Sequence, residues 1–111
     1  MGSFNTLDMK SLPCPNCHHV QDWKIQFKYG NCWQFSYKLY DILRWGGNDR
    51  GKEGAAIVLV EGVPENRCSQ CLEDDFYARI FVDDNQLVAA SLVLKPLLFP
   101  DNPHSDYLII K

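Results

Sequence analysis

The sequence predicts a mainly β fold, namely a small antiparallel β domain stapled by a zinc-ribbon-like four-cysteine site. Three observations support this prediction. Apolar and polar residues alternate with period two in the middle of the chain, two Cys-x-x-Cys pairs supply four thiols, and 46% of the 111 residues are hydrophobic. We therefore expect one domain over residues 1–111, in which residues 1–12 form a flexible N-terminal segment.

The first expected strands form a hairpin. Apolar residues alternate with Lys and Gln in residues 23–29, and a similar alternation returns in residues 33–39, which is typical of half-buried strands. A two-residue loop would send the two aromatic rows to opposite faces. A three-residue loop over residues 30–32 instead pairs Tyr29 with Trp33 and keeps the rows on one face, so we expect a bulged turn there.

The remaining elements are expected to be mainly strands. A single helical turn is expected at residues 40–45. Further strands are expected at residues 56–60, 76–82, 87–94 and 107–110. Residues 83–86 form a tight link between two of these strands, and the Pro-rich residues 95–104 form a surface excursion.

The two Cys-x-x-Cys pairs predict a metal site. A tight turn can direct both sulfurs of a pair at one ion at roughly 2.3 Å, and four thiolates complete the tetrahedral shell of zinc. Such a closed shell leaves no position for water or substrate. We therefore expect one structural Zn²⁺ per chain, bound by Cys14, Cys17, Cys68 and Cys71.

The neighbours of these cysteines leave two questions open. Either His18 or His19 could replace a cysteine ligand, although two complete pairs make this unnecessary. Zinc knuckles often place glycine after the second cysteine, where φ is positive, but this chain has His18 and Leu72 there. Cys32 has no partner in the sequence and is expected to be a small buried hydrophobe or a turn residue.

Other interpretations of these motifs are weaker. Disulfide frameworks normally use an even number of cysteines and follow a secretory signal, whereas this chain has five cysteines and no apolar signal region in residues 1–12. A Cys-Pro-x-Cys redox centre needs a preceding strand and a following helix, and only thirteen residues precede Cys14. Residues 46–53 fit G-x-x-x-x-G-K, but Glu53 stands where a P-loop needs Ser or Thr. We therefore expect no enzyme activity.

Charge is divided unevenly along the chain. Residues 20–54 carry six Lys/Arg and four Asp/Glu, while residues 55–111 carry four and nine, so a net +2 and a net −5 make up the total of −3. Nucleic-acid-binding zinc ribbons usually carry a clear basic patch, whereas an acidic half suits a basic protein partner. The candidate partner-binding residues are Glu73, Asp74, Asp75, Asp83 and Asp84.

Several segments together resemble small bacterial zinc-ribbon-like proteins. These segments are the first cysteine pair, residues 25–31, residues 45–49 with a glycine at 51, and the second cysteine pair, so the resemblance spans roughly residues 14–71. Small acidic proteins of this kind resemble the immunity proteins of polymorphic-toxin systems, which bind a cognate toxin and block it.

This resemblance implies a noncatalytic protein-binding domain that neutralises a toxin encoded nearby. The alternatives are a nucleic-acid-binding zinc ribbon or another protein-assembly module. No apolar run reaches the roughly 20 residues needed to span a bilayer, so we expect a cytoplasmic protein.

Overall fold

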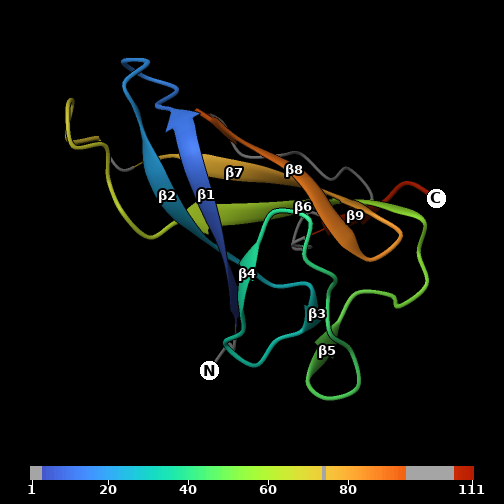
Figure 1. The fold of residues 1–111 in the computed structure, drawn as a ribbon. Helices are drawn as coiled ribbons and strands as arrows, with labels where there is room; N and C mark the ends of the chain where they lie inside the picture. Colours follow the sequence, from blue (N-terminus) through green and yellow to red (C-terminus); the bar gives the residue numbers. More distant parts are fainter. Residues whose placement is uncertain (1–3, 74, 95–106) are drawn as a thin grey trace.

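The computed structural model describes residues 4–73, 75–94 and 107–111, and none of these residues lies in a helix. Seven strands form one sheet in the order β4-β1-β2-β6-β7-β8, with β9 beside β6, while β3 and β5 pair separately (Figure 1). The strands are β1 (Asn5–Pro13), β2 (Val20–Phe27), β3 (Gly30–Asn31), β4 (Ser36–Lys38), β5 (Asp49–Arg50), β6 (Ile57–Pro64), β7 (Tyr77–Asp83), β8 (Gln86–Val93) and β9 (Tyr107–Ile109).

The sheet is mostly antiparallel and curls on itself. Among the described strands, only the pairing of β1 with β4 is parallel, and one edge of β6 pairs with both β2 and β9. The segment after β4 reaches the start of β8, where the Tyr40 amide donates to the Leu87 carbonyl (2.6 Å) and the Leu43 amide to the Asn85 carbonyl (2.8 Å). These bonds connect the segment after β4, the first strand in the order, to β8, the last one.

Every second side chain of the strands points into the curled sheet and forms the hydrophobic core. The inward residues of β2, β6 and β7 are almost fully buried, namely Trp23, Ile25, Phe27, Val58, Val60, Ala78, Ile80 and Val82. Burying a large apolar side chain contributes about 1.5–3 kcal/mol to stability. The outward residues of β1 and β2 are instead mostly charged or amide side chains, so this part of the sheet has one solvated face.

The N-terminal segment is the main correction to the expected fold. Residues 5–12, expected to be flexible, lie in β1, which pairs along β2. Leu7 and Met9 point into the core between the outward Asp8 and Lys10, so this short stretch has the alternation of a strand.

The prediction of a hairpin between residues 23–29 and 33–39 is wrong, again because β1 is a strand of the sheet. β1 occupies the edge of β2 that the hairpin would need, and β4 pairs with β1 instead. Gly30 has a φ of 81°, and Gly30–Asn31 pairs with β5 instead of forming a hairpin turn. The helical turn expected at residues 40–45 is also absent, because the backbone there bonds to β8.

The later strands follow the sequence pattern. The strands expected at residues 56–60, 76–82, 87–94 and 107–110 correspond to β6, β7, β8 and β9, although β6 continues to Pro64. The tight link between β7 and β8 is confirmed, and its central residues Asp84 and Asn85 both have positive φ, as a two-residue hairpin turn requires. The excursion expected at residues 95–104 lies outside the described residues.

Candidate metal centre

The four predicted cysteines come together at one end of the sheet. Their sulfurs all lie within 4.8 Å of one another, with 3.8 Å between those of Cys14 and Cys71 and 3.5 Å between those of Cys17 and Cys68. A tetrahedral ion with bonds of roughly 2.3 Å would separate its ligand sulfurs by about 3.8 Å. The cluster therefore fits one metal ion, and a tetrahedron of four sulfurs is typical of zinc or iron.

Each pair lies in a connection between neighbouring strands. Cys14 and Cys17 follow β1, and Cys68 and Cys71 lie between β6 and β7, so both loops leave the same end of the sheet (Figure 1). Hydrogen bonds fold the two loops alike. The amide two residues after the first cysteine contacts its sulfur at 3.4 Å in both pairs, and the amide four residues after it donates to its carbonyl at 2.9 Å.

The knuckle conformation is present without glycine. His18 has a φ of 69° and Leu72 a φ of 61°, so both side chains that follow a second cysteine adopt the left-handed conformation. This conformation costs a non-glycine residue roughly 1 kcal/mol or more. The repeated hydrogen bonds and a metal bound by both loops would hold the two residues there.

Trp23 supports the cluster from inside the sheet. Its indole nitrogen donates to the Leu12 carbonyl (3.0 Å) just before the first pair, and its ring meets Phe76, just after the second pair, edge to face at 5.9 Å. Trp23 is only 2% exposed. A rigid core residue thus positions the chain on both sides of the metal centre.

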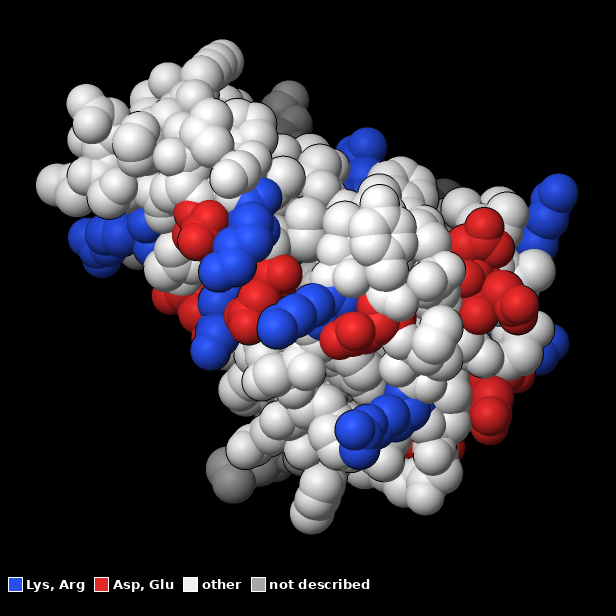
Figure 2. Space-filling model, viewed as in Figure 1, with Lys and Arg blue, Asp and Glu red and all other residues white. Residues whose placement is uncertain are grey.

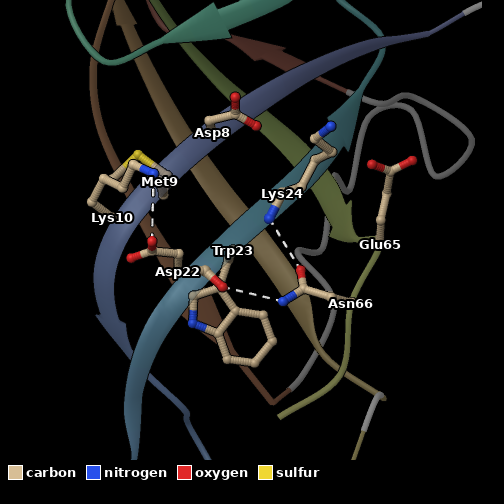
Figure 3. Close-up of a pocket in the computed structure, with 8 residues that line it drawn as sticks. All are labelled: Asp8, Met9, Lys10, Asp22, Trp23, Lys24, Glu65 and Asn66. Carbon is tan, nitrogen blue, oxygen red and sulfur yellow. Dashed lines mark hydrogen bonds and ion pairs between the residues drawn. The ribbon is translucent and has the colours of Figure 1, made fainter. Parts of the chain in front are cut away.

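Polar side chains attach the second loop to β2. The side-chain oxygen of Gln21 accepts from the Ser69 backbone amide (2.8 Å), and its side-chain nitrogen donates to the Arg67 carbonyl (3.0 Å). Asn66 accepts from the Lys24 amide and donates to the Asp22 carbonyl, both at 3.1 Å, and so continues the pairing of β2 beyond the end of β6 (Figure 3). The sequence analysis missed these residues, because an isolated Gln or Asn carries no pattern.

His18, His19 and Cys32 lie outside the cluster of four sulfurs. His18 is exposed, and the His19 ring lies 3.3 Å from the Ser69 hydroxyl. Cys32 is fully buried, and its thiol donates to the Gly30 carbonyl at 3.5 Å. The donor set described by the structure is therefore made of cysteines alone.

The thiols of the cluster compete for ionisation. The pKa of Cys71 is lowered to about 6, first by a hydrogen bond from the Asn16 side chain and then by one from the Glu73 backbone. The pKa of Cys17 is raised to about 12, because a hydrogen bond from the His19 backbone lowers it less than desolvation and the other three thiols together raise it. A metal dication would bind all four cysteines as thiolates, so its binding must release the protons of those that are still thiols.

The acidic candidates for partner binding do not form one patch. Glu73 and Asp75 follow the second cysteine pair, whereas Asp83 and Asp84 lie at the opposite end of β7. Asp74 lies outside the described residues. Any partner surface built on these residues must therefore use one end of β7 or the other.

In the loop that fits a P-loop pattern, two of the backbone amides are already bonded to a carboxylate of the loop itself. The Asp49 carboxylate accepts from the Gly46 amide (3.0 Å) and the Gly47 amide (3.1 Å), which are donors that a phosphate would need. At Gly51, where φ is 91°, a Cβ atom would lie 2.1 Å from the Tyr29 ring. These residues therefore form an exposed turn with its own hydrogen bonds, and Gly51 is needed for its close approach to the Tyr29 ring.

Comparison of this chain with protein-family models, with curated proteins and with solved structures gave no match. The centre is therefore characterised by its own geometry. Among the described residues, no helix has the length and apolar character to cross a membrane.

Proposed function

We propose that this chain is a noncatalytic protein-binding domain whose fold is stabilised by one structural Zn²⁺ in addition to the hydrophobic core. The observation that carries the proposal is the closed set of four sulfurs at tetrahedral spacing, which leaves no coordination position for substrate. Structural zinc contributes about 10–16 kcal/mol at neutral pH, comparable with the whole stability of a small domain. Five unbridged cysteines agree with a reducing compartment, and we place the protein in the cytoplasm.

The charge distribution supports a protein partner over nucleic acid. On the outer face of β1 and β2, Lys10 pairs with Asp22 at 3.4 Å, and both Asp8 and Glu65 line the same hollow as Lys24 (Figure 3). Figure 2 shows the same mixing of basic and acidic side chains across the middle of the molecule. Interleaved carboxylates weaken phosphate binding, because they oppose the counterion release that drives it.

We infer that the partner is a basic toxin that this domain binds and blocks, as the resemblance to immunity proteins of polymorphic-toxin systems implies. The acidic half of the chain would steer such a partner. The test is co-expression of the chain with the toxin domain encoded beside its gene, followed by growth-rescue and binding measurements on the purified pair. Rescue with a 1:1 complex supports the proposal. Failure to bind or protect, combined with tight nucleic-acid binding at about 0.15 M salt, would overturn it.

A further inference from the structure

We propose that the partner docks on a preformed surface beside the start of β8, and that it contacts this surface with apolar side chains surrounded by basic residues. This inference deepens the proposed function and rests on it, because it assumes that the chain binds a basic protein. The surface, here named the docking face, consists of Phe35, Tyr40, Asp41, Ile42 and Arg44. It lies far along the strands from the cysteine cluster (Figure 1).

Two of the side chains of the docking face, Tyr40 and Ile42, are largely exposed, whereas Phe35 packs against the core. Tyr40 is 63% exposed and Ile42 is 59% exposed. Tyr, Trp and Arg are the residues most enriched where truncation weakens protein interfaces. Exposed apolar residues scattered singly are common, so exposure alone does not identify an interface. The fixed backbone at Tyr40 and Ile42 is the second observation.

The backbone of the docking face is fixed in position. The Tyr40 amide donates to the Leu87 carbonyl (2.6 Å), the Leu87 amide to the Asp41 carbonyl (3.0 Å), and the Leu43 amide to the Asn85 carbonyl (2.8 Å). The Gln86 side chain also donates to the Tyr40 carbonyl (3.0 Å). A partner would therefore meet a rigid surface, which reduces the entropy lost on binding.

Tyr40 is held in a strained backbone conformation. Its φ of 75° lies in the left-handed region, where Asn or Gly is tolerated better than an aromatic residue. Because the ring is largely exposed, folding gains little in return. Six other non-glycine residues of the described chain also have positive φ, so this strain supports the docking face only together with the exposure of the ring.

A hollow next to Ile42, whose exposed surface is mostly polar, can receive the polar end of a partner side chain. It has a volume of about 280 Å³ and is lined by Phe35, Ser36, Tyr37, Asp41, Ile42 and Arg44. The Arg44 guanidinium lies over the Phe35 ring, 4.8 Å from its centroid. Stacking on the ring orients the Arg44 guanidinium, whose N–H groups can donate to carbonyls of a partner.

Acidic residues border the docking face on the side of the β7–β8 turn. Ile42 forms a β-bridge with Gln86, two residues after Asp84. Asp83 pairs with Gln86 across the other edge of β8, so it lies one strand away from Ile42. Asp41 lies within the docking face itself, as does the oppositely charged Arg44. Acidic side chains gather toward the right of the view in Figure 2, on the side where β8 begins. This acidic border complements a partner whose contact surface carries basic side chains.

The experiment measures the affinity of the intact, metal-loaded chain for the purified toxin domain encoded beside its gene. Ile42→Ser is compared with Val20→Ser, which truncates a β-branched residue of similar exposure (54%) near the cysteine cluster. We expect Ile42→Ser to raise Kd about 30-fold or more, as at an interface hot spot, and Val20→Ser to change it less than about twofold.

Tyr40→Asn provides a second, more specific readout. Asn accepts a φ of 75°, so the variant should keep or raise the melting temperature while it raises Kd about 30-fold. Unchanged Kd for both Ile42→Ser and Tyr40→Asn would overturn the docking face and leave the proposed function standing. No binding by the unmodified chain would overturn both.

Discussion

At the scale of single residues, Asn5 shows how a polar side chain can organise a core. It is fully buried, and its amide nitrogen donates to the carbonyls of Tyr29 (3.2 Å) and Asn31 (3.1 Å). Its amide oxygen accepts from the backbone amides of Trp33 (3.3 Å) and Phe35 (3.1 Å). Asn5 therefore satisfies backbone groups of a segment that has few strand partners of its own.

Replacing Asn5 by Ala should leave the Tyr29 carbonyl and the Phe35 amide short of partners, whereas the Trp33 amide still donates to the Asn31 carbonyl (3.1 Å). We expect a loss of roughly 2–3 kcal/mol in the free energy of unfolding, measured by urea denaturation, because each buried unsatisfied group costs about 1–3 kcal/mol. Gln26→Ala is the control, since it removes a solvent-exposed hydrogen bond to Glu65 and should cost less than about 0.5 kcal/mol. Equal stability of the two variants would contradict this role.

The metal ligands give the second prediction at this scale. Replacing any one of the four clustered cysteines by Ser should abolish stoichiometric zinc binding and unfold much of the domain, because an incomplete sulfur set cannot close the site. Elemental analysis and circular dichroism measure the two effects. Cys32→Ala, which removes the cysteine outside the cluster, should keep one zinc per chain. Full zinc occupancy in Cys68→Ser would refute the assignment.

At the scale of elements, the sequence predicted what depends on local spacing. The Cys-x-x-Cys pairs and the β7–β8 hairpin could be identified because their geometry is set within a few residues, as at Asp84 and Asn85. The partner of β2 could not be identified in this way. Both residues 33–39 and residues 5–13 carry strand-like alternation, and only the assembled sheet decides which one lies beside β2.

The same limit applies to the surroundings of the metal centre. Ligand identity follows from spacing, but the support from Trp23, Gln21 and Asn66 arises from side chains that meet residues 11 to 48 positions away. Such contacts leave no periodic signal. The knuckle conformation at His18 and Leu72 is likewise imposed by hydrogen bonds and not by a residue that favours positive φ.

Two substitutions within β1 test whether this strand belongs to the folded core. Leu7 is fully buried, and Leu7→Ala should cost about 2–5 kcal/mol. Lys10 points outward and makes only an exposed ion pair with Asp22, so Lys10→Ala should cost less than about 1 kcal/mol. Thermal or urea unfolding measures both. If residues 1–12 were flexible, the two substitutions would have equally small effects.

At the scale of the whole molecule, the cysteine cluster and the proposed docking face lie at opposite ends of the sheet. The cysteine cluster joins the β1–β2 and β6–β7 connections, whereas the docking face lies beside the β7–β8 turn (Figure 1). A metal can therefore hold the fold together without contacting the partner. This separation also divides the acidic residues into two groups that can be tested independently.

Charge reversal at the two ends of β7 should have unequal effects on association with a basic toxin domain. One variant combines Asp83→Lys with Asp84→Asn, because Asn tolerates the φ of 50° at position 84, and the other combines Glu73→Lys with Asp75→Lys. We expect the first variant to slow association about tenfold at low salt, with the difference shrinking near 0.15 M salt, since charges at an interface rim act mainly on the association rate.

The second variant should change the association rate less than about threefold, because its charges lie beside the cysteine cluster and away from the docking face. Stopped-flow binding at two salt concentrations measures the rates, and zinc content confirms that both variants are folded. A larger effect of the second variant would place the partner at the metal end of the molecule. An increase in nucleic-acid binding without any change in toxin association would instead show that the acidic residues serve only to repel phosphate.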